Sequence, residues 1–379
     1  MATPTFTPTS MQQQVFTLSW LSGKATVGNL IGPWSTNDLQ AQINSLNAPF
    51  SNWKVVWGPH YTLDGPFPPQ VSNAIFVAQQ QDGQGGALPV YVVAVAGTNA
   101  LSAYDLQTED LDIDPTEWKR ANNAPSQMQV TTGDMDGLTK ILGMQWPFND
   151  IRTYLASIQN KGNATLWFTG HSLGGALSPM LMLALMDPDS LLDTKDTNLG
   201  LWKQVNLLAT AGPSIGNADF LSHFQSVFSA SNATTTFVWN AKDVVPHAWN
   251  KDRMKALTQP TNIYGLTFPT GSSVGGLIAA QQAAAANQSY VQFEPKAAFE
   301  GPLQPYTDSK NTQVPWTPDS EFLAQLGYQH LNAYVSAFGC NWFPQGNPPS
   351  GCRWFPLSNP CDDPKSAQQA VKMLTGNSN

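Results

Sequence analysis

Short apolar runs separated by Gly- and Pro-containing turns characterise the chain from residue 53 onward. WKVVW (53–57), NAIFVAQ (73–79) and LPVYVVAVAG (88–97) are typical of strands, and the third is apolar enough to be buried on both faces. Three more strand-like runs follow, ATLWFT (164–169), QVNLLAT (204–210) and TTFVWN (235–240), with helix-compatible sequence around them. Strands that alternate with helices predict an α/β fold with a mostly parallel sheet and helices on both faces.

Other segments do not follow this alternation. Residues 1–50 are interpreted as a polar leader followed by a helix-like stretch near Leu39 to Leu46, and a helical region is predicted from Met135 to about Ile158. Residues about 251–320 are rich in Pro, Gly, Gln and Ala, so we interpret them as an insertion or cap rather than as part of the sheet. The chain shows no internal repeat, and residues 1–379 are predicted to form a single α/β domain.

Composition permits a large core and excludes several classes of partner. Hydrophobic residues make up 41% of the chain and charged residues only 12%, which excludes a disordered protein. The net charge of −8 gives no electrostatic attraction to nucleic acid or to an anionic lipid surface. No apolar run reaches the roughly 18 residues that a transmembrane helix requires. We therefore predict no transmembrane segment and only transient contact with a lipid interface.

The first residues of the chain and its cysteines provide evidence on the cellular compartment of the protein. MATPTFTPTS has neither the basic residue nor the apolar segment of a secretory signal. Cys340, Cys352 and Cys361 all lie in the last 40 residues, where one disulfide and one remaining thiol would suit an exported protein. A zinc site is disfavoured because no CxxC pair occurs and no His lies within nine residues of any of them. We expect a secreted protein whose signal is not in the given chain; a cytoplasmic protein with three unpaired thiols is the alternative.

The strongest chemical motif is Gly170-His171-Ser172-Leu173-Gly174, which fits G-x-S-x-G. A strand-like run precedes it and an apolar helix follows, which is the context that a nucleophile elbow requires. Flanking glycines permit the close backbone approach that exposes the serine, and the helix N-terminus favours developing negative charge. The motif therefore predicts Ser172 as a nucleophile and the Leu173 N–H as an oxyanion donor.

An acid and a histidine follow the nucleophile, in that order, in α/β-hydrolases. Asp243 comes shortly after the strand-like run that ends at Asn240, at the sheet edge where ligands bind in open α/β sheets. His330 lies further along the chain in GYQHLNAY, and we take it as the base. The order of these residues is a property of the sequence, whereas their separation in space is not.

The remaining histidines are assigned other roles. His247 is the rival base, but it stands only four residues after Asp243 and is expected to line the substrate pocket or its rim. His171 is expected to pack beneath the substrate or lid, also near the pocket. His60 and His223 are interpreted as structural. Gly97-Thr98 closes the third strand, so the N–H of Thr98 is the candidate for the second oxyanion donor.

Several segments together resemble the class 3 lipases, the filamentous-fungal type of triacylglycerol lipase. They are, in chain order, AVAGTNALS (94–102), TGHSLGGAL (169–177), TAGPSIGNADF (210–220), WNAKDVVPH (239–247) and YQHLNAY (328–334). The resemblance implies an α/β-hydrolase fold with Ser172, Asp243 and His330 as the triad. It also implies Thr98 and Leu173 as the oxyanion donors, and a lid at about residues 99–125.

Two departures from the family pattern stand out. Ala96 occupies a position where the family usually has Arg, and the 251–320 segment delays the histidine and reshapes the expected acyl pocket. The expected activity is hydrolysis of acylglycerols or other lipophilic esters, with no cofactor and no metal. A phospholipase or a feruloyl-type esterase would use the same residues. A catalytically silent binding module is the alternative from another functional class, and the sequence leaves all of these functions open.

Overall fold

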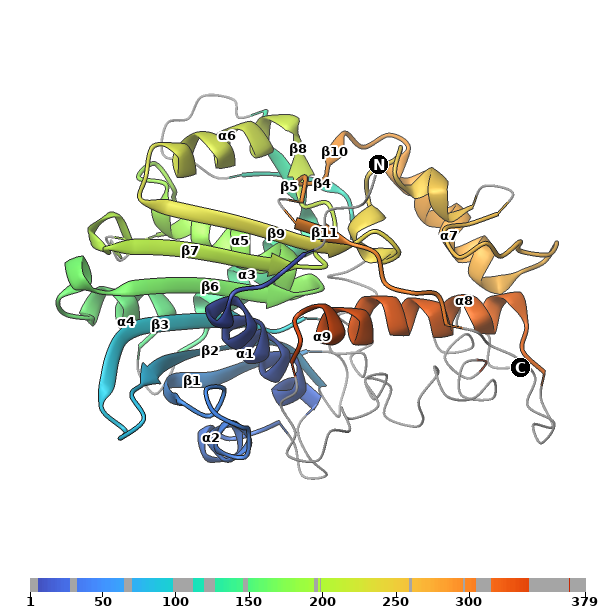
Figure 1. Cartoon of the computed structure of the whole chain (residues 1–379). Coiled ribbons are helices and arrows are strands. Elements are labelled where there is room, and N and C mark those ends of the chain that lie inside the picture. The colour runs from blue at the N-terminus through green and yellow to red at the C-terminus, as the bar shows by residue number, and fades with distance from the viewer. Residues whose placement is uncertain are drawn as a thin grey trace.

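A seven-stranded sheet forms the centre of the computed structural model (Figure 1). The described residues are 6–27, 33–64, 70–97, 112–118, 127–145, 149–193, 197, 199–258, 261–295, 297–304, 315–340 and 368. The strands follow the order β1 (Trp53–Asp64), β2 (Gln70–Gln81), β3 (Ala87–Val95), β6 (Thr165–His171), β7 (Gln204–Thr210), β9 (Ala233–Asn240) and β11 (Ala297–Phe299). β1 and β2 are antiparallel, and every pair from β3 to β11 is parallel. The predicted α/β fold with a mostly parallel sheet is confirmed.

Helices cover both faces of this sheet, as the alternating pattern predicted. Along β3, Val93 and Val95 belong to one hydrophobic core, whereas Val92 and Ala94 belong to the other, because successive side chains of a strand point to opposite faces. The first core includes residues of α3 (Thr132–Gly143), α4 (Ile151–Ser157), α5 (Leu173–Met186) and α6 (Ala218–Ser229). The second includes residues of α1 (Ser10–Val27), α2 (Thr36–Asn44) and α9 (Ala333–Ala337).

Helix α1 contradicts the interpretation of the first residues as a polar leader. It packs on the sheet with Val15, Phe16 and Leu18 almost completely buried. Two of its buried polar residues bond to their own helix: the Thr17 and Ser22 hydroxyls donate to backbone carbonyls three or four residues earlier. Polar and apolar residues are therefore buried all around this helix, which removes the amphipathic period that would have identified it.

The segment 251–320 is less separate from the sheet than predicted. It contains α7 (Ser273–Ala285) and a short 3₁₀ helix (Met254–Leu257), as a cap would, but also β10 (Tyr290–Val291) and β11. Because β11 is the seventh strand of the central sheet, the prediction that this segment contributes no strand is wrong there. α8 (Pro318–Gly327), a π-helical turn (Tyr328–Asn332) and α9 then follow.

A second, smaller sheet lies beside the first, with the order β10, β8 (Gly216–Asn217), β5 (Gln129–Thr131) and β4 (Pro115–Glu117). Of the predicted lid at 99–125, only residues 112–118 are described. There β4 pairs with β5, and Trp118 is fully buried with its ring edge-on to Phe220 at 5.2 Å. These residues are packed into the body of the protein, and the rest of the predicted lid lies outside the described residues.

Three sequence predictions concern features that the structure describes only in part. Cys340 is buried against α1, with its sulfur 4.0 Å from the Thr17 hydroxyl, while Cys352 and Cys361 lie outside the described residues. Within the described ranges, no helix has both the length and the apolar character needed to cross a membrane. The described residues also contain no group of three or more His, Cys, Asp or Glu that could hold a metal ion.

Candidate active site

Ser172 stands at the sharp turn between β6 and α5. Its backbone has φ 61° and ψ −129°, a strained conformation for a residue other than glycine. Such a turn brings the neighbouring backbone segments into very close contact. A Cβ on Gly170 would lie 1.9 Å from the Gly174 carbonyl oxygen, so only glycine fits there. The predicted nucleophile elbow is present, with its serine at the N-terminus of α5.

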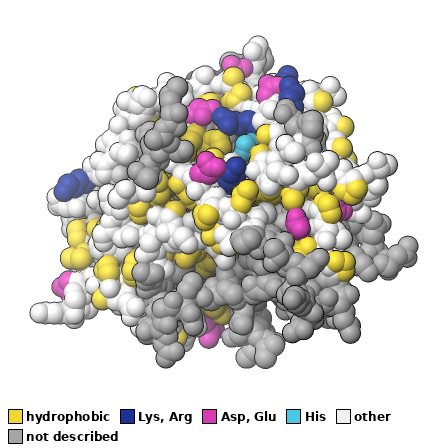
Figure 2. All heavy atoms as spheres, turned by 45° about the vertical axis from the view of Figure 1, so that its right-hand side comes forward, with side chains coloured by type: hydrophobic (Ala, Val, Ile, Leu, Met, Phe, Trp, Pro, Cys, Tyr) yellow, Lys and Arg dark blue, Asp and Glu magenta, His cyan; other side chains and the backbone are white. Residues whose placement is uncertain are grey.

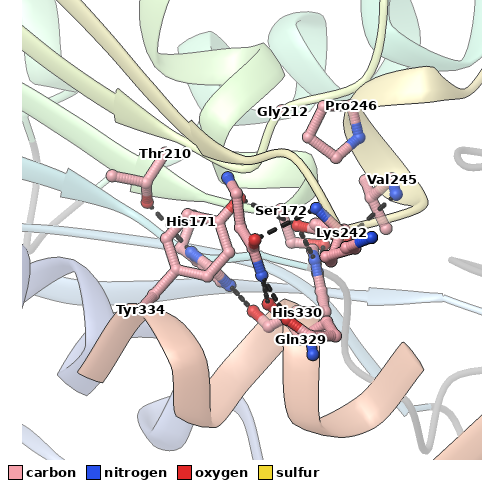
Figure 3. A network of polar contacts seen from close by, with 12 residues as sticks. His171, Ser172, Thr210, Gly212, Lys242, Val245, Pro246, Gln329, His330 and Tyr334 are labelled. Carbon is pink, nitrogen blue, oxygen red and sulfur yellow. Dashed lines mark hydrogen bonds and ion pairs between the residues drawn. The ribbon is translucent and has the colours of Figure 1, made fainter. Parts of the chain in front are cut away.

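Three side chains from distant parts of the chain meet at this turn (Figure 3). The Ser172 Oγ lies 2.8 Å from the His330 Nε2, and the His330 Nδ1 lies 2.8 Å from the Asp243 Oδ2. Asp243 is completely buried and His330 is 8% exposed, whereas Ser172 is half-buried. Since an ionised carboxylate only accepts hydrogen bonds, the His330 Nδ1 carries a proton and its Nε2 is the acceptor for the serine hydroxyl. The structure thus brings together the three residues predicted as nucleophile, acid and base.

Asp243 is held by two further donors. Its Oδ1 accepts from the Val245 N–H at 3.0 Å, and its Oδ2 accepts from the Tyr334 hydroxyl at 2.9 Å. The same hydroxyl accepts from the Asn240 N–H at 2.9 Å, so it is fixed on both sides. Burial, together with the nearby Asp243 charge, raises the pKa of Tyr334 well above its usual value, so the phenol keeps its proton and remains a donor.

His330 lies in the π-helical turn, and Asn240 ties that turn to the end of β9. The Asn240 Nδ2 donates to the Gln329 backbone carbonyl at 3.0 Å and to its side-chain oxygen at 2.6 Å. The Asn240 Oδ1 accepts from the N–H groups of Lys242 and Gly301. Both polar atoms of this buried amide are therefore hydrogen-bonded, and its Nδ2 joins the loop of the acid to the turn of the base. π-helical turns are frequent at functional sites.

Sequence reasoning did not assign a role to Asn240, Gln329 or Tyr334. Each one lies within a segment quoted for its family resemblance, 239–247 or 328–334. The only available signal was therefore their proximity in sequence to Asp243 and His330. Their hydrogen bonds join two segments about 90 residues apart, and no local pattern reports such a contact.

The other histidines occupy different environments. His247 is partly buried with its ring edge-on to Trp239 at 6.0 Å, and burial lowers its pKa. His171 was predicted at the pocket or rim, but it is only 2% exposed and lies on the core side of the triad. His223 pairs with Asp187 at the opposite end of α5 from Ser172, as a structural histidine would.

Only one of the two predicted oxyanion donors can be placed. The backbone N–H of Leu173 belongs to the first residue of α5, where it has no partner within the helix. Thr98 lies outside the described residues, but Gly97 before it lies against the elbow: a Cβ there would be 2.5 Å from the His171 carbonyl oxygen and 3.2 Å from the Ser172 Cβ. The segment directly after β3 therefore lies against the serine.

Two positive side chains flank Asp243 along the chain, with Lys242 directly before it and Arg253 after it. The face of the molecule in Figure 2 shows basic and acidic side chains beside one histidine, with hydrophobic side chains next to them. Lys242 pairs with Glu300 at 3.2 Å, and Arg253 pairs with Glu294. The Arg253 guanidinium also lies 4.9 Å from the centre of the Trp239 ring. These positive charges are thus largely balanced by carboxylates.

Comparisons with known proteins identify a family and a shared fold. The model of the family described as Lipase (class 3) matches residues 92–253, which include Ser172 and Asp243. Among solved structures, the M37 lipase is similar with a TM-score of 0.66 and 24% identity, covering 88% of this chain and 94% of that one. Lipase II from Rhizopus niveus has a TM-score of 0.40 and 17% identity, covering 65% of this chain and 78% of that one. None of the curated proteins matches the chain.

The likeness to the M37 lipase extends over most of both chains and shows a shared fold. His330 lies beyond the segment that the family model matches, so its place in the site comes from the structure. Family and fold together support a hydrolase of the lipase or ester hydrolase type. Residues 92–253 thus belong to the class 3 lipase family, as the resemblance in the sequence indicated, and the chain around them has the α/β-hydrolase fold.

Proposed function

We propose that this protein hydrolyses carboxylic esters through an acyl-enzyme formed on Ser172. The observation that carries this proposal is the unbroken chain of contacts from the Ser172 hydroxyl through His330 to the buried Asp243, each 2.8 Å long. A serine in such a chain can lose its proton to the imidazole as it attacks a carbonyl. The buried carboxylate orients the ring and stabilises the imidazolium that forms.

The proposed reaction has two steps. The Ser172 Oγ attacks the ester carbonyl carbon while the His330 Nε2 takes its proton; the C–O bond to the alcohol then breaks, and the imidazolium protonates the leaving alcohol. In the second step His330 removes a proton from water, which attacks the carbonyl carbon of the acyl-serine. The C–O bond to the Ser172 Oγ then breaks, the imidazolium returns its proton to that oxygen, and the acid is released. The N–H groups of Leu173 and Thr98 are proposed to hold the oxyanion, and the loss of one such donor typically lowers the rate about 100- to 1000-fold.

We propose an acylglycerol or another lipophilic ester as the substrate. The class 3 lipase match of residues 92–253 and the low charge content of the chain support this choice. Hydrolysis of nitrophenyl esters of increasing chain length, with and without an emulsified interface, measures the preference directly. Preferential cleavage of long acyl chains at the interface would support a lipase, whereas preference for phospholipids or for feruloyl esters would reassign the substrate within the same chemistry.

The role of Ser172 is tested by substitution and by covalent labelling. Ser172→Ala should lower kcat by roughly a millionfold, because the nucleophile is lost, and should abolish labelling by a fluorophosphonate probe. Ser178→Ala is a matched control, since Ser178 lies on the same helix with a buried hydroxyl that has no hydrogen-bond partner; it should keep normal activity and labelling. A wild-type protein that neither reacts with the probe nor hydrolyses any ester would instead indicate a catalytically silent binding module.

A further inference from the structure

His171 joins the nucleophile to the base by a route separate from the catalytic hydrogen bond. It is the last residue of β6 and directly precedes Ser172. Its Nδ1 lies 2.9 Å from the Thr210 hydroxyl, and its Nε2 lies 2.8 Å from the backbone carbonyl oxygen of His330 (Figure 3). One imidazole thus spans the end of β7 and the turn that carries the base.

The direction of both hydrogen bonds follows from the partners. A carbonyl oxygen only accepts, so the Nε2 of His171 carries the proton and donates a hydrogen bond to the His330 carbonyl oxygen. Burial, reinforced by the neighbouring His330, lowers the pKa of His171 well below its usual value, so the ring is neutral. A neutral ring with its proton on Nε2 has an unprotonated Nδ1, which therefore accepts from the Thr210 hydroxyl. Its neutrality matters because the two imidazole centres are only 4.8 Å apart, and a charged His171 would oppose the imidazolium of His330.

Aromatic side chains hold the His171 ring in place. Tyr334 lies edge-on at 5.0 Å, and Phe16 and Trp20 of α1 each lie at about 6.1 Å. Phe16 also stacks on Phe338, at the end of α9, at 4.1 Å. Helix α1, which lies outside the segment matched by the family model, therefore packs against both the ring and the helix that follows the base. With only 2% of His171 exposed, the ring has little room to turn.

We propose that His171 is a positioning residue, which holds the main chain of His330 at the distance that lets its imidazole reach the Ser172 hydroxyl. The backbone of His171 is covalently joined to Ser172, and its side chain donates to the carbonyl of His330, so the two catalytic residues are connected through a single residue. This role rests on the proposed function. It does not require His171 to contact the substrate or to exchange a proton.

Three substitutions separate the two hydrogen bonds. His171→Gln places an amide N–H near the position of Nε2 and can still donate to the His330 carbonyl. His171→Asn reaches only the position of Nδ1, and His171→Leu makes neither contact. Because a misplacement of about 1 Å can cost about 100-fold, we expect kcat to fall about 10- to 100-fold in the Asn and Leu variants. The Gln variant should stay within about threefold of the wild-type kcat, and KM should change little in all three.

Two controls distinguish positioning from packing. His223→Gln replaces another largely buried histidine, paired with Asp187 away from the site, and should lower the melting temperature without changing kcat. Thr210→Val removes the hydroxyl that donates to the Nδ1 of His171 and that also lies 3.3 Å from the Gly170 carbonyl oxygen. This substitution should lower kcat about fivefold even if the Leu or Asn variant does not fold. The rate of fluorophosphonate labelling of Ser172 should fall in parallel with kcat.

The order of kcat among the three His171 variants decides whether His171 has the proposed positioning role. Recovery of kcat in the Gln variant relative to Asn and Leu supports the positioning role. Equal kcat in all three variants, whether normal or reduced, overturns it, because a packing role would not distinguish a donor at Nε2 from one at Nδ1. The wild-type protein is measured first: if it hydrolyses no ester and is not labelled, the proposed function fails rather than the role of His171 alone.

Discussion

The Tyr334 hydroxyl offers a sharp test of how the acid is held. Tyr334→Phe removes one oxygen atom from a completely buried side chain and leaves the ring in place. That oxygen donates to the Asp243 Oδ2 and accepts from the Asn240 N–H, each at 2.9 Å. The substitution therefore deletes two hydrogen bonds and leaves one backbone donor buried without its partner.

The expected magnitudes follow from these two contacts. A hydrogen bond to a charged group contributes about 1.5–3 kcal/mol, and an orphaned buried N–H costs about 1–3 kcal/mol, so we expect the free energy of unfolding to fall by about 3–5 kcal/mol. The effect on catalysis should be smaller than loss of the acid itself, because Val245 and His330 still bind the carboxylate. A loss of about 1–2 kcal/mol in transition-state stabilisation corresponds to about a 5- to 30-fold lower kcat/KM.

Urea unfolding and steady-state ester hydrolysis measure the two effects separately. Tyr61→Phe is the matched control, because its hydroxyl donates to the Trp34 carbonyl at 2.6 Å in the first part of the chain, away from the triad. It should lower stability by about 1 kcal/mol and leave kcat/KM unchanged. A Tyr334→Phe protein with kcat/KM within twofold of wild type and stability within about 0.5 kcal/mol would refute the contribution assigned to this hydroxyl.

Three further predictions concern the acid, the elbow and pH. Asp243→Asn should lower kcat about 10⁴-fold in a steady-state assay, because the amide no longer selects the required His330 tautomer; a loss below tenfold would contradict its role. Gly170→Ala should abolish soluble expression, because the new Cβ would overlap the Gly174 carbonyl, whereas Gly83→Ala, which meets nothing within 4 Å, should express normally. The pKa of buried His171 lies well below 6.5, so near pH 6 and below the unfolded chain binds a proton that the folded chain does not. The free energy of unfolding should therefore fall as the pH drops below about 6.5, by up to about 1.4 kcal/mol per pH unit. His171→Gln should show a shallower slope between pH 7 and 5 in urea titrations, and identical slopes would argue against a neutral His171.

The local sequence was sufficient to predict those features that depend on residues close together in the chain. The long strands of the sheet could be predicted because a buried parallel strand is a continuous apolar run, and Ser172 could be predicted because its elbow is one tight turn. Helix α1 was missed because its buried positions include polar residues that bond to their own backbone. β11 was missed because three residues form a strand only where β9 offers them a partner.

By itself, the amino-acid sequence determined the α/β fold, the nucleophile elbow and the order serine, aspartate, histidine. These depend on hydrophobic periodicity and on contacts between residues close along the chain. Only the tertiary structure decided that His330 rather than His247 reaches the serine, that Tyr334 and Asn240 hold the acid and the base, and that His171 lies beneath the triad rather than at its rim. These contacts join residues about 90 to 160 positions apart, and their geometry is set by the packing of helices and strands, which no local pattern encodes.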